Sequence, residues 1–373
     1  MVDPTSPRYL PTRIVIPDLV SHCTFNLRKS RYHRMLSIET KRWLFRGDSL
    51  DKGAQRAFHG LKAGQLTAMC YPKAGYPQMR VSSDFLNWLF HLDNLSDDMD
   101  NRSITEVANV VMNSLHHPYT FRSNARLSRM TREYVPGLPS VMLYLEHRAS
   151  FYKRMLQTAR SGACQRFMET LELFFQAINT QATDRAHGFI PNLESYIALR
   201  RDTSGCKPCW ALIEYAYNLN IPDEVIDHPL ICSLGEAAND LVTWSNVSHV
   251  SVCRLPCLMR FQDIFSYNVE QSRGHTHNMI NVVINEQGLD LQGAFDFVGD
   301  LCKHSMDRFI ECRKQLPSWG PEVDRDVAIY ADGLEDWMVG SLHWSFDTER
   351  YFGTHGHEIK KMKVITLLPP RGP

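Results

Sequence analysis

The chain has 373 residues, of which 43% are hydrophobic and 10% aromatic, and it carries 41 basic and 41 acidic side chains. This composition excludes an intrinsically disordered protein, because there is ample apolar material for a core. The formal net charge of zero argues against a nucleic-acid groove, which would need a basic excess. No apolar run reaches the length of a membrane span. We therefore expect a small-molecule partner, no nucleic acid and no stable membrane insertion.

Ten cysteines lie at irregular spacings, after a polar, proline-bearing N-terminal stretch (MVDPTSPRYLPTR) that shows no signal peptide. This pattern favours free thiols and a reducing compartment, so we expect a cytoplasmic protein. Cys206 and Cys209 form a CxxC pair. Because neither a second pair nor a preceding strand accompanies it, a redox or metal-binding role is the less favoured interpretation.

Helical periodicity runs through nearly the whole chain, and no convincing strand pattern is present. Proline and glycine cluster in the joints between the periodic segments. Without internal repeats or a polar linker, the sequence predicts one all-α domain over residues 1–373. The expected helices cover residues 36–47, 52–70, 81–98, 104–115, 122–133, 151–160, 163–184, 192–202, 206–220, 230–246, 263–273, 289–315, 325–342 and 344–351.

The helix expected over 81–98 changes from apolar to acidic at its end, in the run FLNWLFHLDNLSDDMD at 85–100. Asp93 and Asp97 stand at i and i+4, so their carboxylates leave one helical face and repel each other unless a cation lies between them. Mg²⁺ is commonly held by one or two carboxylates while phosphate oxygens of a substrate complete its octahedron. The alternative is a solvated acidic helix end, which spacing alone favours.

Two further segments carry arginines that could bind phosphate. Arg200 and Arg201 end a helix in SYIALRRDTSGC, and Arg350 precedes Tyr351 in WSFDTERYFG. The forked donors of arginine match the oxygens of a diphosphate. Each arginine alone is more typical of a protein surface, but together with an acidic helix they predict a diphosphate site.

A polar helix is expected in DIFSYNVEQSRGHTHN, residues 263–278. It places Ser266 and Glu270 at i and i+4 on one helical face, where both can offer oxygen ligands. A third oxygen ligand would be expected four residues before Ser266. That position holds Gln262, an unusual choice for a metal ligand.

These motifs together resemble the fungal (basidiomycete) sesquiterpene synthases, a branch of the class I terpene cyclases. The resemblance covers most of the chain, and its motifs are specific in combination rather than singly. The acidic motif of that family, D(D/E/N)xxD, is matched by Asp93 and Asp97. Its second metal motif, N-D-x-x-S-x-x-x-E, is matched by Ser266 and Glu270 but lacks an asparagine in register.

Two asparagines could supply the missing ligand. Asn239 begins an Asn-Asp pair, but the residues four and eight positions later are Thr243 and Val247, so the carboxylate is absent. Asn246 fits better. When residues 247–262 are removed, Asn246 joins the following DIFSYNVE and the motif is complete.

The segment 247–262, VSHVSVCRLPCLMRFQ, is therefore interpreted as a retained intron. Its ends can be encoded by splice-compatible codons, and Pro256 disfavours a continuous helix. On an unbroken helix the 20 residues between Asn246 and Ser266 would span about 30 Å, too far for two ligands of one ion. The chain as printed could unite them only by looping the segment out.

A second insertion is expected in the first half of the chain. The helix of the family resembles MTRDFYKRML, whereas this chain continues from MTRE through YVPGLPSVMLYLEHRAS before FYKRML. Splicing at codon-compatible borders would replace Glu133–Ser150 by one aspartate. Removing residues 134–150 and 247–262, which are 17 and 16 residues long, leaves 340 of 373. A genuine lineage-specific insertion is the alternative in both places.

The resemblance implies a class I terpene synthase fold, an α-helical bundle around a deep apolar cavity with both metal motifs at its mouth. It implies Mg²⁺-dependent ionisation of farnesyl diphosphate, cyclisation to a sesquiterpene and release of diphosphate by a monomer or weak homodimer. Three Mg²⁺ ions are expected, held by Asp93, Asp97, Asn246, Ser266 and Glu270. Arg201, Arg350 and Tyr351 are expected to bind the diphosphate, and Asp93, Arg201 and Tyr351 to be catalytic. Phe85, Trp88 and Trp344 are candidates for stabilising the carbocation, with core packing as the alternative.

Three other interpretations remain open. A prenyl-elongating synthase would need two full DDxxD motifs, and only one acidic motif is present. A catalytically impaired or dead helical protein would result if the insertions split the second metal motif. The third is a wrongly assigned gene structure, in which the chain is never translated in this form.

Overall fold

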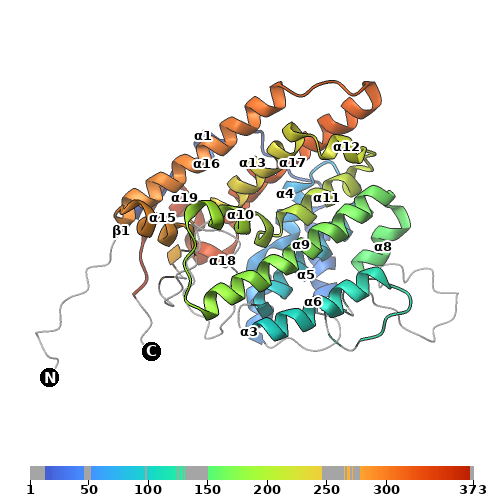
Figure 1. Cartoon of the computed structure of the whole chain (residues 1–373), viewed down its shortest axis with the longest axis horizontal. Coiled ribbons are helices and arrows are strands. Elements are labelled where there is room, and N and C mark those ends of the chain that lie inside the picture. Colours follow the sequence, from blue (N-terminus) through green and yellow to red (C-terminus); the bar gives the residue numbers. More distant parts are fainter. Residues whose placement is uncertain are drawn as a thin grey trace, which may run out of the picture.

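The computed structural model of the protein describes residues 13–45, 52–96, 99–123, 125, 127–128, 130, 150–245, 264, 267–268, 271 and 278–369, without the side chains of residues 93, 94, 96 and 185. Helices dominate this part of the chain, so the all-α prediction is confirmed (Figure 1). None of the described helices is both long and apolar enough to cross a membrane.

The first half contains α1 (Leu19–His22), α2 (His33–Leu44), α3 (Lys52–Leu61), α4 (Ala63–Cys70), α5 (Tyr76–Ser96), α6 (Asn101–His116), α8 (Phe151–Thr158) and α9 (Ser161–Ala186). The second half contains α10 (Leu193–Thr203), α11 (Cys206–Tyr217), α12 (Asp223–Ile226), α13 (Pro229–Trp244), α15 (Met279–Gln287), α16 (Leu291–Lys314), α17 (Pro321–Asp347), α18 (Glu349–Phe352), the 3₁₀ helix η2 (Gly353–His355) and α19 (Gly356–Met362). The expected helices over 122–133 and 263–273 lie largely outside the described residues.

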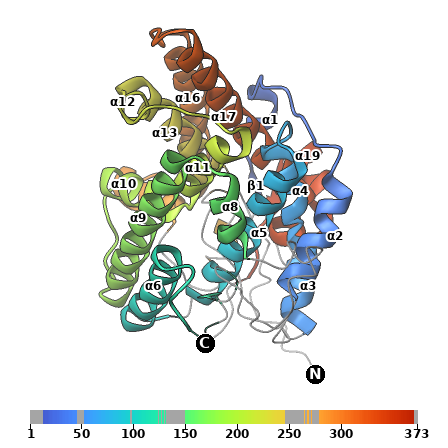
Figure 2. The same ribbon diagram turned by 90° about the vertical axis from the view of Figure 1, so that its right-hand side faces the viewer.

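At the centre of the bundle, α11 packs against both α5 and α17. α16 covers α13 along one edge of the molecule, while α6 packs on α9 at another, as Figures 1 and 2 show from two directions. α5 is enclosed by α2, α4, α8 and α11, and every residue from 79 to 92 is buried. The apolar run that precedes Asp93 therefore forms a helix buried all round, as such a composition predicts.

A short break between α3 and α4 divides the segment 52–70, which the sequence predicts as one helix. Lys62 lies at the break in the left-handed region, with φ 55°. Its Nζ donates to the backbone oxygen of Asp347 at 2.6 Å and lies 3.6 Å from the carboxylate of Glu349. The single-helix prediction was wrong because tertiary contacts hold this non-glycine residue in a conformation that it adopts rarely.

The border predicted between helices 325–342 and 344–351 was also wrong, because α17 continues unbroken to Asp347. Neither proline nor glycine lies at that border to end the helix. The expected helices also did not include α1, α12, α15, α19 or the 3₁₀ helix η2. The structure also contains one two-stranded antiparallel sheet, β1 (Arg13–Val15) with β2 (Val364–Thr366), in which Ile14 faces Ile365. Three residues are too few to show an alternating pattern.

The two segments interpreted as insertions lie outside the described residues except for Ser150. Its hydroxyl accepts a hydrogen bond from the backbone N–H of Lys153 at 3.3 Å, so Ser150 caps the start of α8. The single-domain assignment and both insertions therefore stay predictions.

Candidate functional site

The predicted metal ligands fall mostly outside the described part of the chain. Asp93 lies in the last turn of α5, but its side chain is not described, and Asp97 follows the end of that helix. The second motif, Asn246 with Ser266 and Glu270, lies wholly outside. Among the described side chains, no group of three or more His, Cys, Asp or Glu residues could hold a metal ion.

One acidic residue of this region has a structural role. Asp100 caps α6 by accepting the backbone N–H of Ser103 at 2.9 Å. Hydrogen bonds from Ser103 lower the pKa of this carboxyl. Part of the acidic run at 93–100 thus starts the next helix, so Asp100 is an N-cap residue of α6.

Aromatic side chains on α5 divide into two groups by the direction they face. Phe85 stacks on Trp88 with ring centroids 5.7 Å apart, and it lies 5.6 Å from Phe151 and 5.0 Å from Phe167. The indole N–H of Trp88 donates to the backbone oxygen of Leu127 at 3.3 Å. This cluster fills the contact between α5, α8 and α9, so the structure gives Phe85 and Trp88 a packing role.

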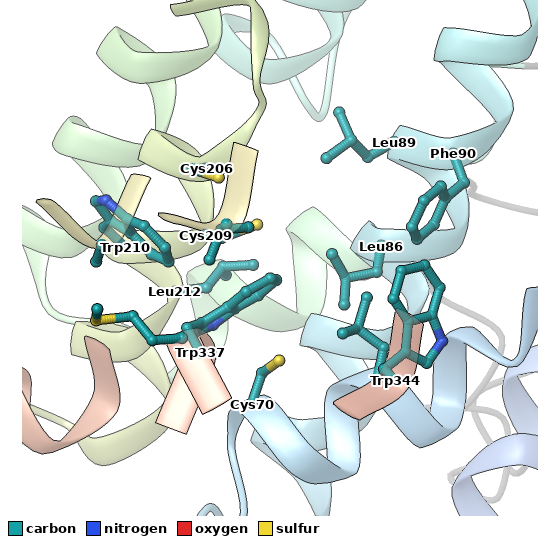
Figure 3. Packing of buried hydrophobic residues seen from close by; sticks show 14 of the residues in the cluster. Cys70, Leu86, Leu89, Phe90, Cys206, Cys209, Trp210, Leu212, Trp337 and Trp344 are labelled. Atoms are coloured by element: carbon teal, nitrogen blue, oxygen red, sulfur yellow. The ribbon is translucent and has the colours of Figure 1, made fainter. Parts of the chain in front are cut away.

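The opposite face of α5 looks toward the centre of the bundle. Figure 3 shows Leu86, Leu89 and Phe90 on one side of the interior, with residues of α11 and α17 on the other. Those residues are Cys206, Cys209, Trp210, Leu212 and Trp337, and Cys70 of α4 lies below them. The interior at this level is lined by apolar side chains and thiols.

Arg350 and Tyr351 lie beside this face of α5. The guanidinium carbon of Arg350 is 5.6 Å from the ring centroid of Phe90 and 5.9 Å from that of Tyr351. Tyr351 packs edge-on against Trp344 at 5.7 Å, and the indole N–H of Trp344 donates to the oxygen of Leu61 at 3.0 Å. Since Phe90 precedes Asp93 by three residues, the structure brings the predicted Arg-Tyr pair within one helical turn of the acidic motif.

Thr348 fixes the start of α18 and with it the place of Arg350. Its hydroxyl accepts the backbone N–H of Arg350 at 3.2 Å. The same hydroxyl lies 3.1 Å from the backbone oxygens of Gly60 and Leu61, to which it can donate. The turn between α17 and α18 is therefore attached to the end of α3.

Arg201 lies in the last turn of α10 and contacts α13. Its Nε donates to Oδ1 of Asp240 at 2.8 Å and Nη2 to Oδ2 at 2.7 Å. Its Nη1 lies 2.8 Å from the carboxylate of Glu236. The hydrogen bonds with Asp240 raise the pKa of Arg201, so this guanidinium stays charged and is held by two carboxylates.

Arg200 occupies the inward face of the same turn. It is 2% exposed, and it shares the buried face of α10 with Tyr196 and Thr203, at i, i+4 and i+7. Burial raises the pKa of the neighbouring Cys206 thiol, and the positive charge of Arg200 offsets a small part of this shift. This spacing of buried residues is the signal by which the sequence could have assigned the interior position to Arg200 rather than Arg201.

The CxxC pair begins α11 directly after Gly205, whose φ of 67° suits glycine and separates α10 from α11. Burial raises the pKa of Cys206 to about 11, and it raises the pKa of Cys209 as well. The Cys209 thiol donates to the oxygen of Gly205 at 3.3 Å. Both cysteines are free and buried, so they are neutral thiols in the interior.

Comparison with known proteins agrees with the motifs. The family described as terpene synthase family 2, C-terminal metal binding, matches residues 84–308. The chain is 59% identical to sesquiterpene synthase Agr1 of Cyclocybe aegerita, over 96% of this chain and 94% of that protein. It is 58% identical to sesquiterpene synthase 1 of Postia placenta, over 97% of each.

A solved structure shows the same fold at much lower identity. Germacradien-4-ol synthase from Streptomyces citricolor superposes with a TM-score of 0.66 at 19% identity, over 86% of this chain and 98% of that one. The expected class I terpene synthase fold is confirmed by this likeness. The chain therefore belongs to the terpene synthase family, in the branch of the fungal (basidiomycete) sesquiterpene synthases.

Proposed function

We propose that the chain is a sesquiterpene synthase that ionises farnesyl diphosphate, cyclises the carbocation and releases diphosphate. Family membership supports the reaction class. The observation that carries the assignment to this site is the position of Arg350 and Tyr351 beside Phe90, one turn before Asp93. A diphosphate bound there would meet a forked donor and a phenol next to the acidic end of α5.

Arg200 and Arg201 would serve the same diphosphate from the opposite helix. Arg201 stays a predicted ligand, but its guanidinium is already engaged by Asp240 and Glu236. Arg200 faces inward, which suits direct contact with a substrate. We therefore favour Arg200 for that contact, and the electrostatic benefit would be largest because this part of the interior excludes water.

The proposed metal site would use Asp93 and Asp97 from one helix and Asn246, Ser266 and Glu270 from the second motif. All five donors are oxygen atoms, the ligand type that Mg²⁺ prefers, so the chemistry of the set fits this ion. Bound Mg²⁺, with three ions expected, would neutralise the charge that develops on the leaving diphosphate. The metal identity and the number of ions are part of the proposal.

The apolar face of α5 would shelter the cation once the diphosphate has left. Leu86 and Leu89 face Leu212 and Trp337 across the interior (Figure 3), so these side chains would keep water from the reacting carbons. An aromatic face contributes about 0.5–2 kcal/mol to binding a desolvated cation. Trp337 is placed for such a contact, whereas Phe85 and Trp88 face away.

The direct experiment is incubation of the purified protein with farnesyl diphosphate and MgCl₂, with products identified by gas chromatography. Sesquiterpenes and free diphosphate are expected. Arg350→Lys keeps the charge but loses the planar fork, so it should weaken binding of inorganic diphosphate with Mg²⁺ by about 1.5–3 kcal/mol. Equal affinities of wild type and variant in calorimetric titration would remove Arg350 from the site.

The second candidate is a catalytically impaired protein of the same fold. The observation in its favour is that residues 247–262 separate Asn246 from Ser266 and Glu270 in the sequence, which splits the second metal motif. The 373-residue chain and the 340-residue form without residues 134–150 and 247–262 should be assayed side by side. Equal activity would show that both segments are accommodated, and activity of the short form alone would support retained introns. The cytoplasmic location and the state as monomer or weak homodimer stay predictions.

A further inference from the structure

The Asn239–Asp240 pair, which resembles the start of a metal motif, lies in the structure at the contact of three helices. Asp240 is buried on α13, where its Oδ2 accepts Nη2 of Arg201 from α10 and Nη2 of Arg308 from α16, each at 2.7 Å. α13 packs against both of these helices, and Figure 1 shows the three together. A buried carboxylate bound by two arginines has its charge compensated, so it is not available as a metal ligand.

Asn239 holds the same turn of α10 through its backbone. Its side-chain Nδ2 donates to the carbonyl oxygen of Arg201 at 2.8 Å, and its Oδ1 accepts the hydroxyl of Thr243 at 2.8 Å. A carbonyl oxygen can only accept, so this contact fixes which end of the amide faces α10. The bond also satisfies one of the carbonyls that a helix end leaves without an intrahelical partner.

The two contacts together determine how α10 is rotated about its axis at Arg201. Successive residues of a helix are about 100° apart, so fixing both the side chain and the carbonyl of Arg201 fixes the direction of Arg200. Four residues after Arg201, Gly205 adopts a left-handed conformation, and the chain leaves the direction of α10 there. The hydroxyl of Ser204 donates to the same carbonyl oxygen of Arg201 at 3.0 Å, but this bond stays within the turn, whereas Asn239 and Asp240 join the turn to α13.

We propose that Asn239 and Asp240 are positioning residues, which hold the last turn of α10 against α13 so that Arg200 keeps its orientation toward the substrate diphosphate. They do not touch the substrate themselves. This inference rests on the proposed function, since it requires a diphosphate to be bound by Arg200. It assigns to the pair a role in aligning the arginine helix with α13, the helix that leads toward Asn246.

The test compares Asp240→Asn with a control of matched chemistry elsewhere in the protein. Glu214 on α11 is also a buried carboxylate bound to an arginine, with Nε of Arg166 donating to Oε1 at 3.0 Å. Both Asp240→Asn and Glu214→Gln should lower the melting temperature of the full chain. Only Asp240→Asn should weaken inorganic diphosphate binding in the presence of Mg²⁺, by at least tenfold in a calorimetric titration, while Glu214→Gln stays within twofold of wild type.

Two further variants separate positioning from general stability. Asn239→Asp keeps the volume and the acceptor for Thr243 but loses the donor to Arg201, so it should also weaken diphosphate binding at least tenfold. This variant decides the matter if Asp240→Asn does not fold. Glu236→Gln removes only the exposed partner of Arg201 and should bind diphosphate as wild type does. In addition, the double variant Asp240→Asn with Arg201→Gln should have about the same affinity for diphosphate as the single variant with the lower affinity, because both substitutions remove the same contact.

Failure of the inference can be told from failure of the proposed function. If the wild type does not bind inorganic diphosphate with Mg²⁺, the proposed site is wrong and the positioning role falls with it. If the wild type binds and Arg350→Lys weakens binding, the site stands. In that case, wild-type affinity in both Asn239→Asp and a folded Asp240→Asn would overturn the positioning role alone.

Discussion

Two buried aspartates, Asp84 and Asp240, each bind two arginines, but their surroundings differ. In the Asp84 cluster, the carboxylate pairs with Arg80 and Arg154, whose side chains are 4% and 11% exposed. In the Asp240 cluster, the side chains of Arg201 and Arg308 are 22% and 38% exposed. The first is enclosed by protein, whereas the arginines of the second reach solvent.

The neighbouring hydrogen bonds deepen this difference. Asp84 also accepts the hydroxyl of Thr40 at 2.6 Å, and Thr40 in turn accepts Nδ2 of Asn87 at 3.1 Å. Such a network joins α2, α5 and α8 in a region without solvent, which makes its charges costly to separate. The Asp240 cluster adjoins the turn that carries Arg200. The same chemistry can therefore stabilise the bundle in one place and orient a binding residue in another.

The largest effect on stability is expected for Asp84→Asn. The substitution removes the counter-charge of Arg154 and the nearest counter-charge of Arg80, whose other carboxylate neighbour, Glu39, lies 3.8 Å away. The free energy of unfolding should therefore fall by about 3–5 kcal/mol. Urea denaturation of wild type and variant measures this difference. A loss below about 1 kcal/mol, the range of exposed ion pairs, would show that the Asp84 cluster is no more enclosed than the Asp240 cluster.

Asp336 on α17 is a third buried carboxylate, and its negative charge is compensated less fully than the charges of Asp84 and Asp240. Nη1 of Arg28 donates to its Oδ1 at 3.3 Å, and within the described part of the chain Oδ2 has no hydrogen-bond partner. Burial raises the pKa of Asp336 from 3.8 to about 7, and Arg28 and Lys73 offset only part of this shift. Because the pKa of Asp336 is higher in the folded than in the unfolded protein, protonation of this carboxyl favours folding. This contribution to stability is fully present below pH 3.8 and is lost as the pH rises through about 7.

We therefore expect the wild type to lose stability relative to Asp336→Asn between these two pH values, with a slope approaching about 1.4 kcal/mol per pH unit. Urea denaturation of both proteins at pH 5, 6, 7 and 8 provides the comparison, and the difference should level off above pH 7. A difference that does not change with pH would mean that Asp336 is ionised in the folded protein throughout, like a fully paired aspartate.

The smallest effect is expected for Glu236→Gln. Glu236 pairs with Arg201 at the solvent side of the Asp240 cluster, and its side chain is 45% exposed. Solvent screens such a pair, so the free energy of unfolding should change by no more than about 1 kcal/mol. Thermal unfolding at low and high salt can check this. A larger loss would mean that the Asp240 cluster depends on its exposed partner.

The long helices could be predicted from the sequence because their apolar periodicity is sustained. α9, α13 and α16 begin and end within two residues of the expected borders. The break at Lys62 could not be predicted, since it depends on Asp347 and Glu349 far along the chain. The pairing of β1 with β2 likewise joins the two ends of the described chain, and neither strand carries a signal of its own.

The candidate site was predictable to a similar degree. The sequence predicts that Arg350 and Tyr351 bind the diphosphate, and the structure brings Arg350 beside Phe90 of α5. The spacing of Tyr196, Arg200 and Thr203 points to Arg200 as the interior arginine, but the ion pairs that engage Arg201 depend on residues of α13 about 40 positions later in the chain, which no local pattern reveals. The metal ligands stay predictions because their side chains lie outside the described residues.

The unbroken course of α17 has a consequence for how this protein can change in length. At 1.5 Å per residue, its 27 residues make a rod of about 40 Å, and Arg350 follows three residues after its end. One inserted or deleted residue would turn everything beyond it by about 100° and move Arg350 away from Phe90. Length variation is therefore tolerable in the connecting loops, whereas the number of residues between Trp337 of α17 and Arg350 of α18 is fixed by the geometry of the candidate site.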